Sequence, residues 1–187
     1  GRFRRVMAAP LKAGGNIMLA WWLVPALMMM AGAADAATPT TDCAANMVCA
    51  SRPQSVVDAL QAAGYKAALT KSKSTGNPMI ESAASGYNFT IYFYGCEEMK
   101  DCNSLQFGIN FADDGGNTIE LANKWNQSKR FIQMSLADDK TLDVSYDVST
   151  IGGLNQENFA DVVDWWSVML GELSKFFKEN PAPTLKK

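Results

Sequence analysis

The sequence contains no histidine among its 187 residues. This absence removes the commonest general base of enzymes and the commonest side-chain ligand of transition metals. A serine triad of the usual kind is therefore excluded, and neither a G-x-S-x-G elbow nor a phosphate-binding glycine loop is present. Catalysis by carboxylates alone remains as a hypothesis, with Glu81, Glu97 and Asp113 as its candidate residues.

Basic charge is also scarce. The chain has 17 lysines and arginines against 19 aspartates and glutamates. Without residues 1–36, which hold four of the basic and one of the acidic residues, 13 positive and 18 negative charges remain, a net charge of −5. Proteins that bind nucleic acid concentrate basic charge, so we expect no nucleic-acid partner.

The sequence lacks an apolar run long enough for an ordinary membrane-spanning helix. Its longest candidate, 17–31, is short for that purpose and is interrupted by Pro25. Basic residues precede this run: Arg2, Arg4, Arg5 and Lys12. A small-residue A-x-A sequence follows at 34–36, which completes the layout of a secretory signal peptide cleaved after Ala36. We therefore expect a periplasmic or secreted protein without a stable membrane anchor after cleavage; an uncleaved anchor is the alternative.

Cysteines are few but even in number: four, all beyond residue 36. In an oxidising compartment such cysteines form disulfides, and four of them allow three connectivities. The hairpin described next places Cys96 opposite Cys102, which leaves Cys43 with Cys49. Five residues separate the members of each pair, unlike the C-x-x-C spacing of thiol oxidoreductases, so we expect structural bonds.

Residues 86–111 predict a β-hairpin. When the two cysteines face each other, four apolar pairs fall on one face: Phe93 with Leu105, Ile91 with Phe107, Phe89 with Ile109, and Tyr87 with Phe111. The intervening pairs, which include Tyr92 and Tyr94, form a more polar face. Alternation on both arms in one register is typical of antiparallel strands.

The remaining chain alternates between helical and strand periodicities. We expect a mobile leader over 37–50 and a flexible tail over 179–187. Helices are expected near 51–64 with Ser51 as the N-cap, at 118–128 with Asn117 as the cap, and after the cap Asn155. Strands are expected at 65–70, 78–83, 131–137 and 141–148. The order α-β-β-β-β-α-β-β-α predicts an α+β fold, with an antiparallel sheet of five to six strands covered by helices on one face.

The last helix has a long apolar stripe at helical spacing. Its members are Phe159, Val162, Val163, Trp166, Leu170, Leu173 and Phe177. Trp165 points away from the centre of this stripe. Together with Tyr92 and Tyr94 of the polar hairpin face, it is a candidate for a partner interface.

Several stretches resemble the YbjN domain family of bacterial proteins: GNPMIES (76–82), the 86–107 hairpin, ANKWNQSKRF (122–131), and the tail from LDVSYDVS to the last helix. The resemblance covers residues 51–178. It implies a regulator of sensory transduction whose fold is similar to that of type III secretion chaperones, which bind segments of other proteins. It implies no catalytic residue and no cofactor.

The most specific element of the resemblance comprises Asn123, Trp125, Asn126 and Arg130. These residues either form a recognition patch or fix the turn from helix to strand, with Trp125 packed on the sheet; we favour the structural interpretation.

Acidic residues gather at the hairpin tip (Glu97, Glu98, Asp101) and in the next loop (Asp113, Asp114). Their spacing is not that of a calcium-binding loop, so solvated loop charges are expected rather than a metal site.

We therefore expect a non-enzymatic exported module that binds a protein or peptide in a chaperone-like manner, with a homodimer left open. The alternatives are a small-molecule sensor with a pocket between sheet and helices, and a carboxylate-dependent envelope hydrolase.

Overall fold

The computed structural model describes residues 43–182, so the predicted signal peptide, residues 37–42 of the leader and residues 183–187 lie outside the described part. The elements in this range are α1 (Pro53–Ala62), β1 (Ala68–Lys71), β2 (Pro78–Ala84), β3 (Tyr87–Tyr94), β4 (Ser104–Phe111), α2 (Ile119–Ser128), β5 (Gln133–Leu136), β6 (Leu142–Ser149) and α3 (Gln156–Glu179). Their order is the predicted one. None of these helices has the length and apolar character needed to cross a membrane.

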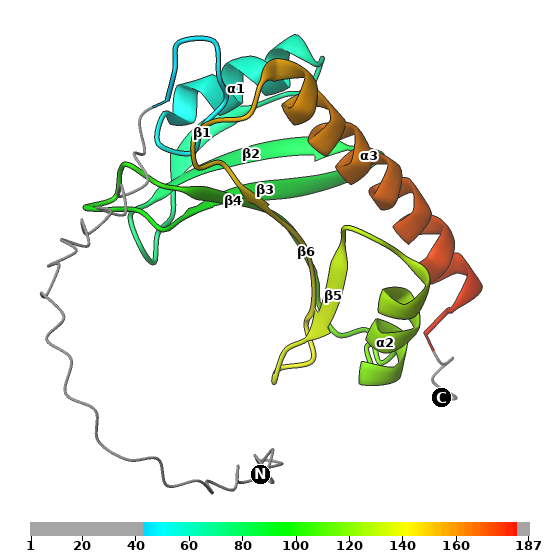
Figure 1. Ribbon diagram of the computed structural model, residues 1–187. Coiled ribbons are helices and arrows are strands. Elements are labelled where there is room, and N and C mark those ends of the chain that lie inside the picture. The colour runs from blue at the N-terminus through cyan, green and yellow to red at the C-terminus, as the bar shows by residue number, and fades with distance from the viewer. Residues whose placement is uncertain (1–42, 183–187) are drawn as a thin grey trace, which may run out of the picture. The chain divides into compact units, whose positions relative to one another are not determined.

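The strands form one antiparallel sheet in the order β1-β2-β3-β4-β6-β5. The helices lie on one side of this sheet, which is strongly curved (Figure 1). The predicted α+β fold is therefore confirmed. We call the side under the helices the covered face and the other side the bare face.

The register of the central hairpin is the predicted one from Thr90–Gly108 to Tyr94–Ser104. Pairing stops there, so the predicted pairs of Phe89 with Ile109 and of Tyr87 with Phe111 are not part of the ladder. The arms separate because each follows its outer neighbour, with Phe89 opposite Ser82 of β2 and Ile109 opposite Val144 of β6. The rings of Tyr87 and Phe111 still meet edge to face, 5.7 Å apart.

Two of the predicted helix caps were wrong. Helix α1 begins one residue later than expected, with Arg52 at the N-cap position and Pro53 in the first turn, where its missing N–H costs nothing. Helix α2 is capped by Thr118, whose Oγ1 accepts from Leu121 N–H at 3.1 Å. The side chain of Asn117 instead donates to the carbonyls of Phe111 and Lys140.

The predicted cap Asn155 was right: its side chain accepts from Asn158 N–H at 2.7 Å. The strand expected from residue 65 begins at Ala68. Tyr65 N–H still donates to Leu60 O and so closes the end of α1.

The described part of the leader is packed against the domain, contrary to the expected mobility. Val48 is fully buried and forms two backbone hydrogen bonds with Leu154, before α3. The Arg52 guanidinium donates to four carbonyls between residues 43 and 47. The sulfur atoms of Cys43 and Cys49 lie at bonding distance, as do those of Cys96 and Cys102.

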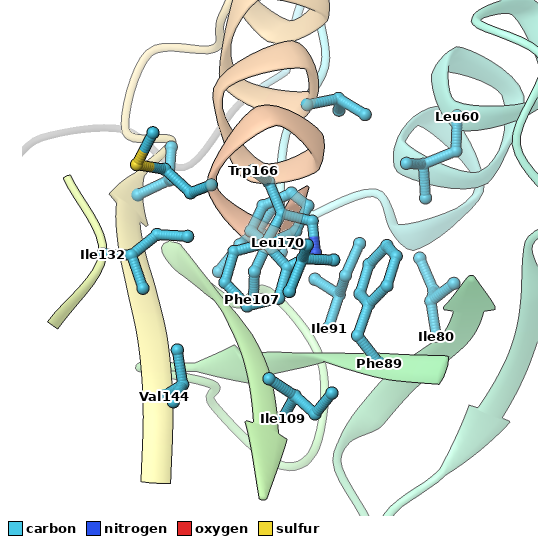
Figure 2. Close-up of a cluster of buried hydrophobic side chains, with 14 of the residues drawn as sticks. Leu60, Ile80, Phe89, Ile91, Phe107, Ile109, Ile132, Val144, Trp166 and Leu170 are labelled. Carbon is cyan, nitrogen blue, oxygen red and sulfur yellow. The ribbon is translucent and has the colours of Figure 1, made fainter. Parts of the chain in front are cut away.

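The core fills the space between the covered face and the helices. Trp166 is fully buried, with its ring 5.5 Å from that of Phe89 and 5.7 Å from that of Phe107. Figure 2 shows this cluster, with Leu60 of α1 and Leu170 of α3 directed toward the strands. The buried side of α3 is Phe159, Val163, Trp166, Met169, Leu170, Leu173 and Phe176. The predicted Val162 and Phe177 are partly buried at its margin.

Candidate functional site

Two residues of the 122–131 motif join α2 to the sheet edge. Trp125 is fully buried, and its Nε1–H donates to Ile132 O at 3.0 Å. The Asn126 side chain makes two hydrogen bonds with the backbone of Met134: it donates to the carbonyl and accepts from the N–H, each at 2.9 Å. Asn123 is exposed, and its side chain forms no hydrogen bond within residues 43–182. These contacts support the structural interpretation for Trp125 and Asn126.

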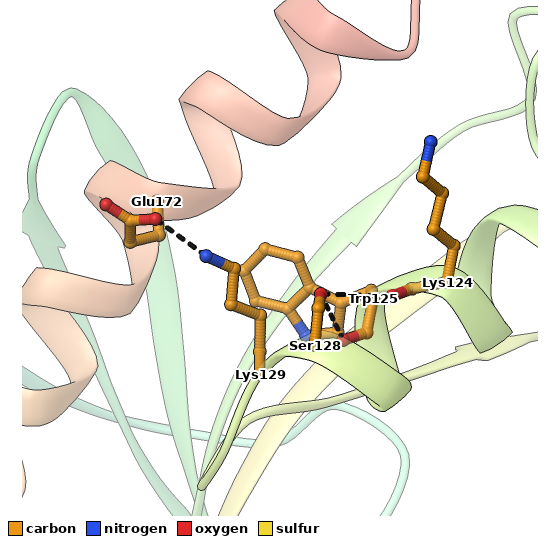
Figure 3. Close-up of polar contacts among 5 residues, drawn as sticks. All are labelled: Lys124, Trp125, Ser128, Lys129 and Glu172. Atoms are coloured by element: carbon orange, nitrogen blue, oxygen red, sulfur yellow. Dashed lines mark hydrogen bonds and ion pairs between the residues drawn. The ribbon is translucent and has the colours of Figure 1, made fainter.

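The end of α2 is also fixed to α3 (Figure 3). Lys129 Nζ lies 2.7 Å from Glu172 Oε2 and 5.8 Å from the centre of the Trp125 ring. The hydrogen bond and the charge of Lys129 lower the pKa of the Glu172 carboxyl. Ser128 Oγ donates to the carbonyls of Lys124 and Trp125 at 3.0 Å. These contacts therefore fix the backbone at the C-terminal end of α2, where the chain turns toward β5.

Arg130, Phe131, Tyr146 and Trp165 form a surface cluster, the aromatic patch. The ring of Phe131 lies 4.6 Å from that of Trp165 and 6.0 Å from that of Tyr146. The Arg130 guanidinium lies 5.0 Å above the Phe131 ring. Phe131 is 41% exposed and Trp165 37% exposed. Burial, and next the nearby Asp161 carboxylate, raise the pKa of Tyr146.

The backbone at Phe131 is strained. Its φ is +68°, and Ile132 N–H donates to Arg130 O at 2.8 Å across a three-residue turn. A bulky residue at positive φ costs about 1–3 kcal/mol and persists only when its surroundings fix it. Here the Trp125 hydrogen bond to Ile132 fixes the next residue. This turn explains why the strand predicted from residue 131 begins at Gln133.

Tyr92 and Tyr94 lie on the bare face. The Tyr92 ring covers Gly108, where an added Cβ would lie 3.2 Å from Tyr92 Cε2. Tyr94 is 48% exposed, and its hydroxyl lies 3.4 Å from Gln106 Oε1. Gln106 in turn donates to Asp147 at 2.9 Å. Burial, followed by Tyr92 and Asp147, raises the pKa of Tyr94.

The candidate carboxylates lie on three separate segments. Glu81 is on β2, Glu97 is in the hairpin tip where its backbone pairs with Lys100, and Asp113 accepts from Gly115 N–H in the loop after β4. All three are exposed. Within residues 43–182, no group of three or more histidine, cysteine or acidic residues is arranged to hold a metal ion.

A groove of about 940 Å³ lies where the sheet opens, and we call it the sheet groove. Its lining includes Lys66, Glu81, Ser82, Asn88, Phe89 and Ile109. Two ladders end at this place: β1–β2 pairing ends at Ala68–Glu81, and β3–β4 pairing ends at Thr90–Gly108. Ser82 is only 7% exposed, and its hydroxyl has no hydrogen-bond partner.

A family model described as "putative bacterial sensory transduction regulator", YbjN, matches residues 52–179, more than half of the chain. The chain belongs to the YbjN family. A crystal structure of YbjN from E. coli, titled a putative transcription regulator, aligns with 15% sequence identity over 60% of this chain and 80% of that chain, with a TM-score of 0.42. No curated protein matches the chain. The YbjN family is thus described in terms of regulation rather than of an enzymatic reaction.

The sequence predicted Trp165 and Arg130 as candidates but missed Phe131 and Tyr146 as their neighbours. A signal for Phe131 existed, since it is a large aromatic residue in the polar phase of the strand 131–137. No comparable feature of the sequence indicated the sheet groove. Its position depends on where two ladders end, and alternation continues in the sequence past both points.

Proposed function

We propose that this YbjN-family protein is an exported, non-enzymatic regulatory module that binds a peptide segment of another protein in the sheet groove, in a chaperone-like manner. The observation that supports this function best is the opening of the sheet at Thr90–Gly108, which coincides with the sheet groove of about 940 Å³. Where ladders end, backbone N–H and C=O groups become available to an added peptide, which recognises them through its own backbone.

The lining of the sheet groove suits a short peptide. Phe89 and Ile109 supply apolar surface, and Asn88 supplies an amide that can both donate and accept. The buried Ser82 hydroxyl lacks a protein partner, and a buried polar group without a hydrogen bond is costly. A peptide amide that reached this hydroxyl would remove that cost.

Opposite charges also line the sheet groove. Lys66 and Glu81 both belong to it, and neither forms an ion pair within residues 43–182. Each charge is therefore available to a ligand. A peptide with a free ammonium group and a free carboxylate would pair with Glu81 and Lys66 respectively. We take a zwitterionic tripeptide as the simplest probe.

Export is supported by the two cysteine pairs at bonding distance, because disulfides persist mainly in oxidising compartments. The intact mass of protein recovered from the periplasm tests this part of the proposal. We expect the mass of residues 37–187 less four hydrogens. A full-length, reduced protein in the membrane fraction would contradict both cleavage and export.

The binding test is a titration of ¹⁵N-labelled protein with the tripeptide Ala-Phe-Ala, followed by NMR. We expect amide shifts at residues 88–90 and 108–110. Lys66→Met and Glu81→Gln each remove one charge partner and should weaken binding at least about tenfold, since a charge-assisted hydrogen bond contributes about 1.5–3 kcal/mol. Ser82→Ala should weaken it less. Mass spectrometry should recover the tripeptide uncleaved.

Lys100→Met and Glu97→Gln are the matched controls, because they make the same changes at the exposed hairpin tip. They should leave the affinity unchanged. Equal affinity for free phenylalanine would favour a small-molecule sensor over a peptide-binding module. Cleavage of the tripeptide, lost in Glu81→Gln, would instead establish a carboxylate-dependent hydrolase.

A further inference from the structure

We propose that a cavity at the C-terminal end of α3 binds a small organic cation with an apolar body, of the arylalkylamine class. The cavity has a volume of about 370 Å³, and we call it the α3-end cavity. It adjoins the sheet groove, with which it shares Asn110, but a ligand here needs no peptide in the groove. Its lining includes Phe111, Asp114, Gly116, Leu121, Phe177 and Ala182.

Three segments that are distant in the sequence build the α3-end cavity. The end of β4 supplies Phe111, the first turn of α2 supplies Leu121, and the last turn of α3 supplies Phe177. The last turns of α3 lie beside α2 (Figure 1), where Lys124 Nζ donates to Asn180 Oδ1 at 2.6 Å. The walls are therefore in place without a ligand, and a preformed site loses less conformational entropy on binding.

The apolar part of the α3-end cavity suits an aromatic ring. Phe111, Leu121 and Phe177 pack against the core, yet each is only partly buried. The rings of Phe111 and Phe177 meet edge to face, with centroids 5.0 Å apart. A ligand ring would cover the remaining surface of these side chains, and aromatic pairs gain stability beyond the area that they bury. The volume is also within the range of small-molecule sites.

The charge of the α3-end cavity indicates the charge of its ligand. Asp114 is the charged residue among the described residues that line it. This carboxylate forms no ion pair within residues 43–182, and its Oδ1 accepts from Gly116 N–H at 2.9 Å. An ammonium group would pair with it. A ligand carboxylate would instead meet Asp114 without a lysine or arginine in the lining to offset the repulsion.

The other polar groups around the α3-end cavity also favour a hydrogen-bond donor as the ligand. The side-chain nitrogen of Asn117 donates to two backbone carbonyls, those of Phe111 and Lys140. The Asn117 Oδ1 is thus the atom left to accept from an ammonium N–H. Lys124 does not compete for this place, because it lines a neighbouring hollow together with Glu179.

The chain after α3 closes one side of the α3-end cavity at Gly116. A Cβ added to Gly116 would lie 2.8 Å from Ala182 Cβ and 2.9 Å from Ala182 Cα, so glycine permits this close approach. The N–H of the same glycine is bonded to Asp114. One turn therefore fixes both the closing segment and the charged group of the cavity.

A titration of ¹⁵N-labelled protein with 2-phenylethylamine, followed by NMR, tests the site. We expect amide shifts at residues 111–117, 121 and 177, and none at residues 88–90. Two probes with the same ring and a different head group test the charge: 2-phenylethanol should bind more weakly than the amine, and 3-phenylpropanoate more weakly still. Tightest binding by the carboxylate would overturn the proposed ligand class.

Asp114→Asn should weaken the binding of 2-phenylethylamine about two- to fivefold, because Asp114 is exposed and exposed ion pairs contribute little. Asp113→Asn is the matched control. Asp113 makes the same kind of contact, with Gly115 N–H at 2.9 Å, but does not line the cavity. It should change the affinity less. Equal losses in the two variants would reflect general charge attraction and would overturn the contact with Asp114.

Gly116→Ala should also weaken binding, because the added Cβ displaces Ala182. Gly171→Ala is its control, since an added Cβ at this position of α3 has no neighbouring atom within 4 Å outside the backbone of its own helix. It should leave the affinity unchanged. The NMR spectra of the variants also show whether each is folded.

Glu81→Gln separates the α3-end cavity from the sheet groove. This variant should weaken binding of the tripeptide but leave the affinity for 2-phenylethylamine unchanged. Shifts confined to residues 88–90 and lost in Glu81→Gln would place the amine in the sheet groove and overturn the proposal. The absence of any shift at millimolar amine would overturn it as well, whatever the outcome for the tripeptide.

Discussion

Both faces of the sheet contain aromatic side chains, in different surroundings. On the covered face, Phe107 is fully buried between Phe89, Tyr146 and Trp166, with ring centroids 5.7–6.2 Å apart. On the bare face, the Tyr92 ring covers Gly108, which lies two residues along the neighbouring strand from its partner Gln106. The first ring is enclosed by other side chains, and the second has water on one side.

The difference shows how one sheet can separate stability from recognition. Removing a buried ring loses apolar burial and leaves a cavity, because packed neighbours relax only partly. Removing a ring from the bare face leaves no cavity, because water fills the vacated space. Polar side chains on that face, such as Gln106 bonded to Asp147, can likewise exchange their hydrogen bonds with water. The bare face can therefore change with little loss of stability.

The largest expected effect is that of Phe107→Ala, set against Tyr92→Ala on the adjacent strand. We expect Phe107→Ala to lower the free energy of unfolding by about 3–5 kcal/mol. Tyr92→Ala, which loses a partial contact with Gly108, should lower it by about 1 kcal/mol. Urea denaturation of both variants measures the difference. Equal losses would mean that the bare face is packed in solution, and the two-face comparison would not hold.

The sequence predicted which residues lie on each face of the sheet, because successive side chains of a strand point to opposite faces. Ile91 and Phe107 alternate with Tyr92 and Gln106 on paired arms, and a shift of one residue would move each apolar side chain into water. The order of elements and the covered face follow from the same alternation. Most of the buried side of α3 was also predicted, apart from Met169 and from Phe176, which packs on Trp125 of α2.

The alternation of apolar and polar residues could not predict contacts between segments that are distant in the sequence. Alternation in the sequence continues past Thr90 and Gly108, although the arms separate there to follow β2 and β6. Similarly, nothing local to Phe131 signals a positive φ. That conformation results from Trp125 and Lys129, which fix the chain from opposite sides of the turn. The sheet groove and the aromatic patch both arise from these long-range constraints.

Smaller losses of stability are expected when asparagines are replaced by alanine. These substitutions extend the comparison of the two faces to polar residues. Asn126 and Asn110 both form side-chain hydrogen bonds, but with different partners. Asn126 bonds the N–H and the C=O of Met134, which link α2 to β5. Asn110 donates to the Asp143 carboxylate, and both side chains are on the bare face. The first pair of bonds satisfies backbone groups at the edge of the covered layer; the second joins two solvated side chains.

We expect Asn126→Ala to lower the free energy of unfolding by about 1–3 kcal/mol, because two partly buried backbone groups lose their partner. Asn110→Ala should change it by no more than about 0.5 kcal/mol, since water replaces the amide. Asn123→Ala, on the exposed side of the same helix, is the control for helix propensity. Thermal and urea unfolding measure all three. Replacing asparagine by alanine raises helix propensity at both positions. If Asn123→Ala nevertheless proved as costly as Asn126→Ala, the loss would not come from the hydrogen bonds to Met134, and the motif would lose its structural role at Asn126.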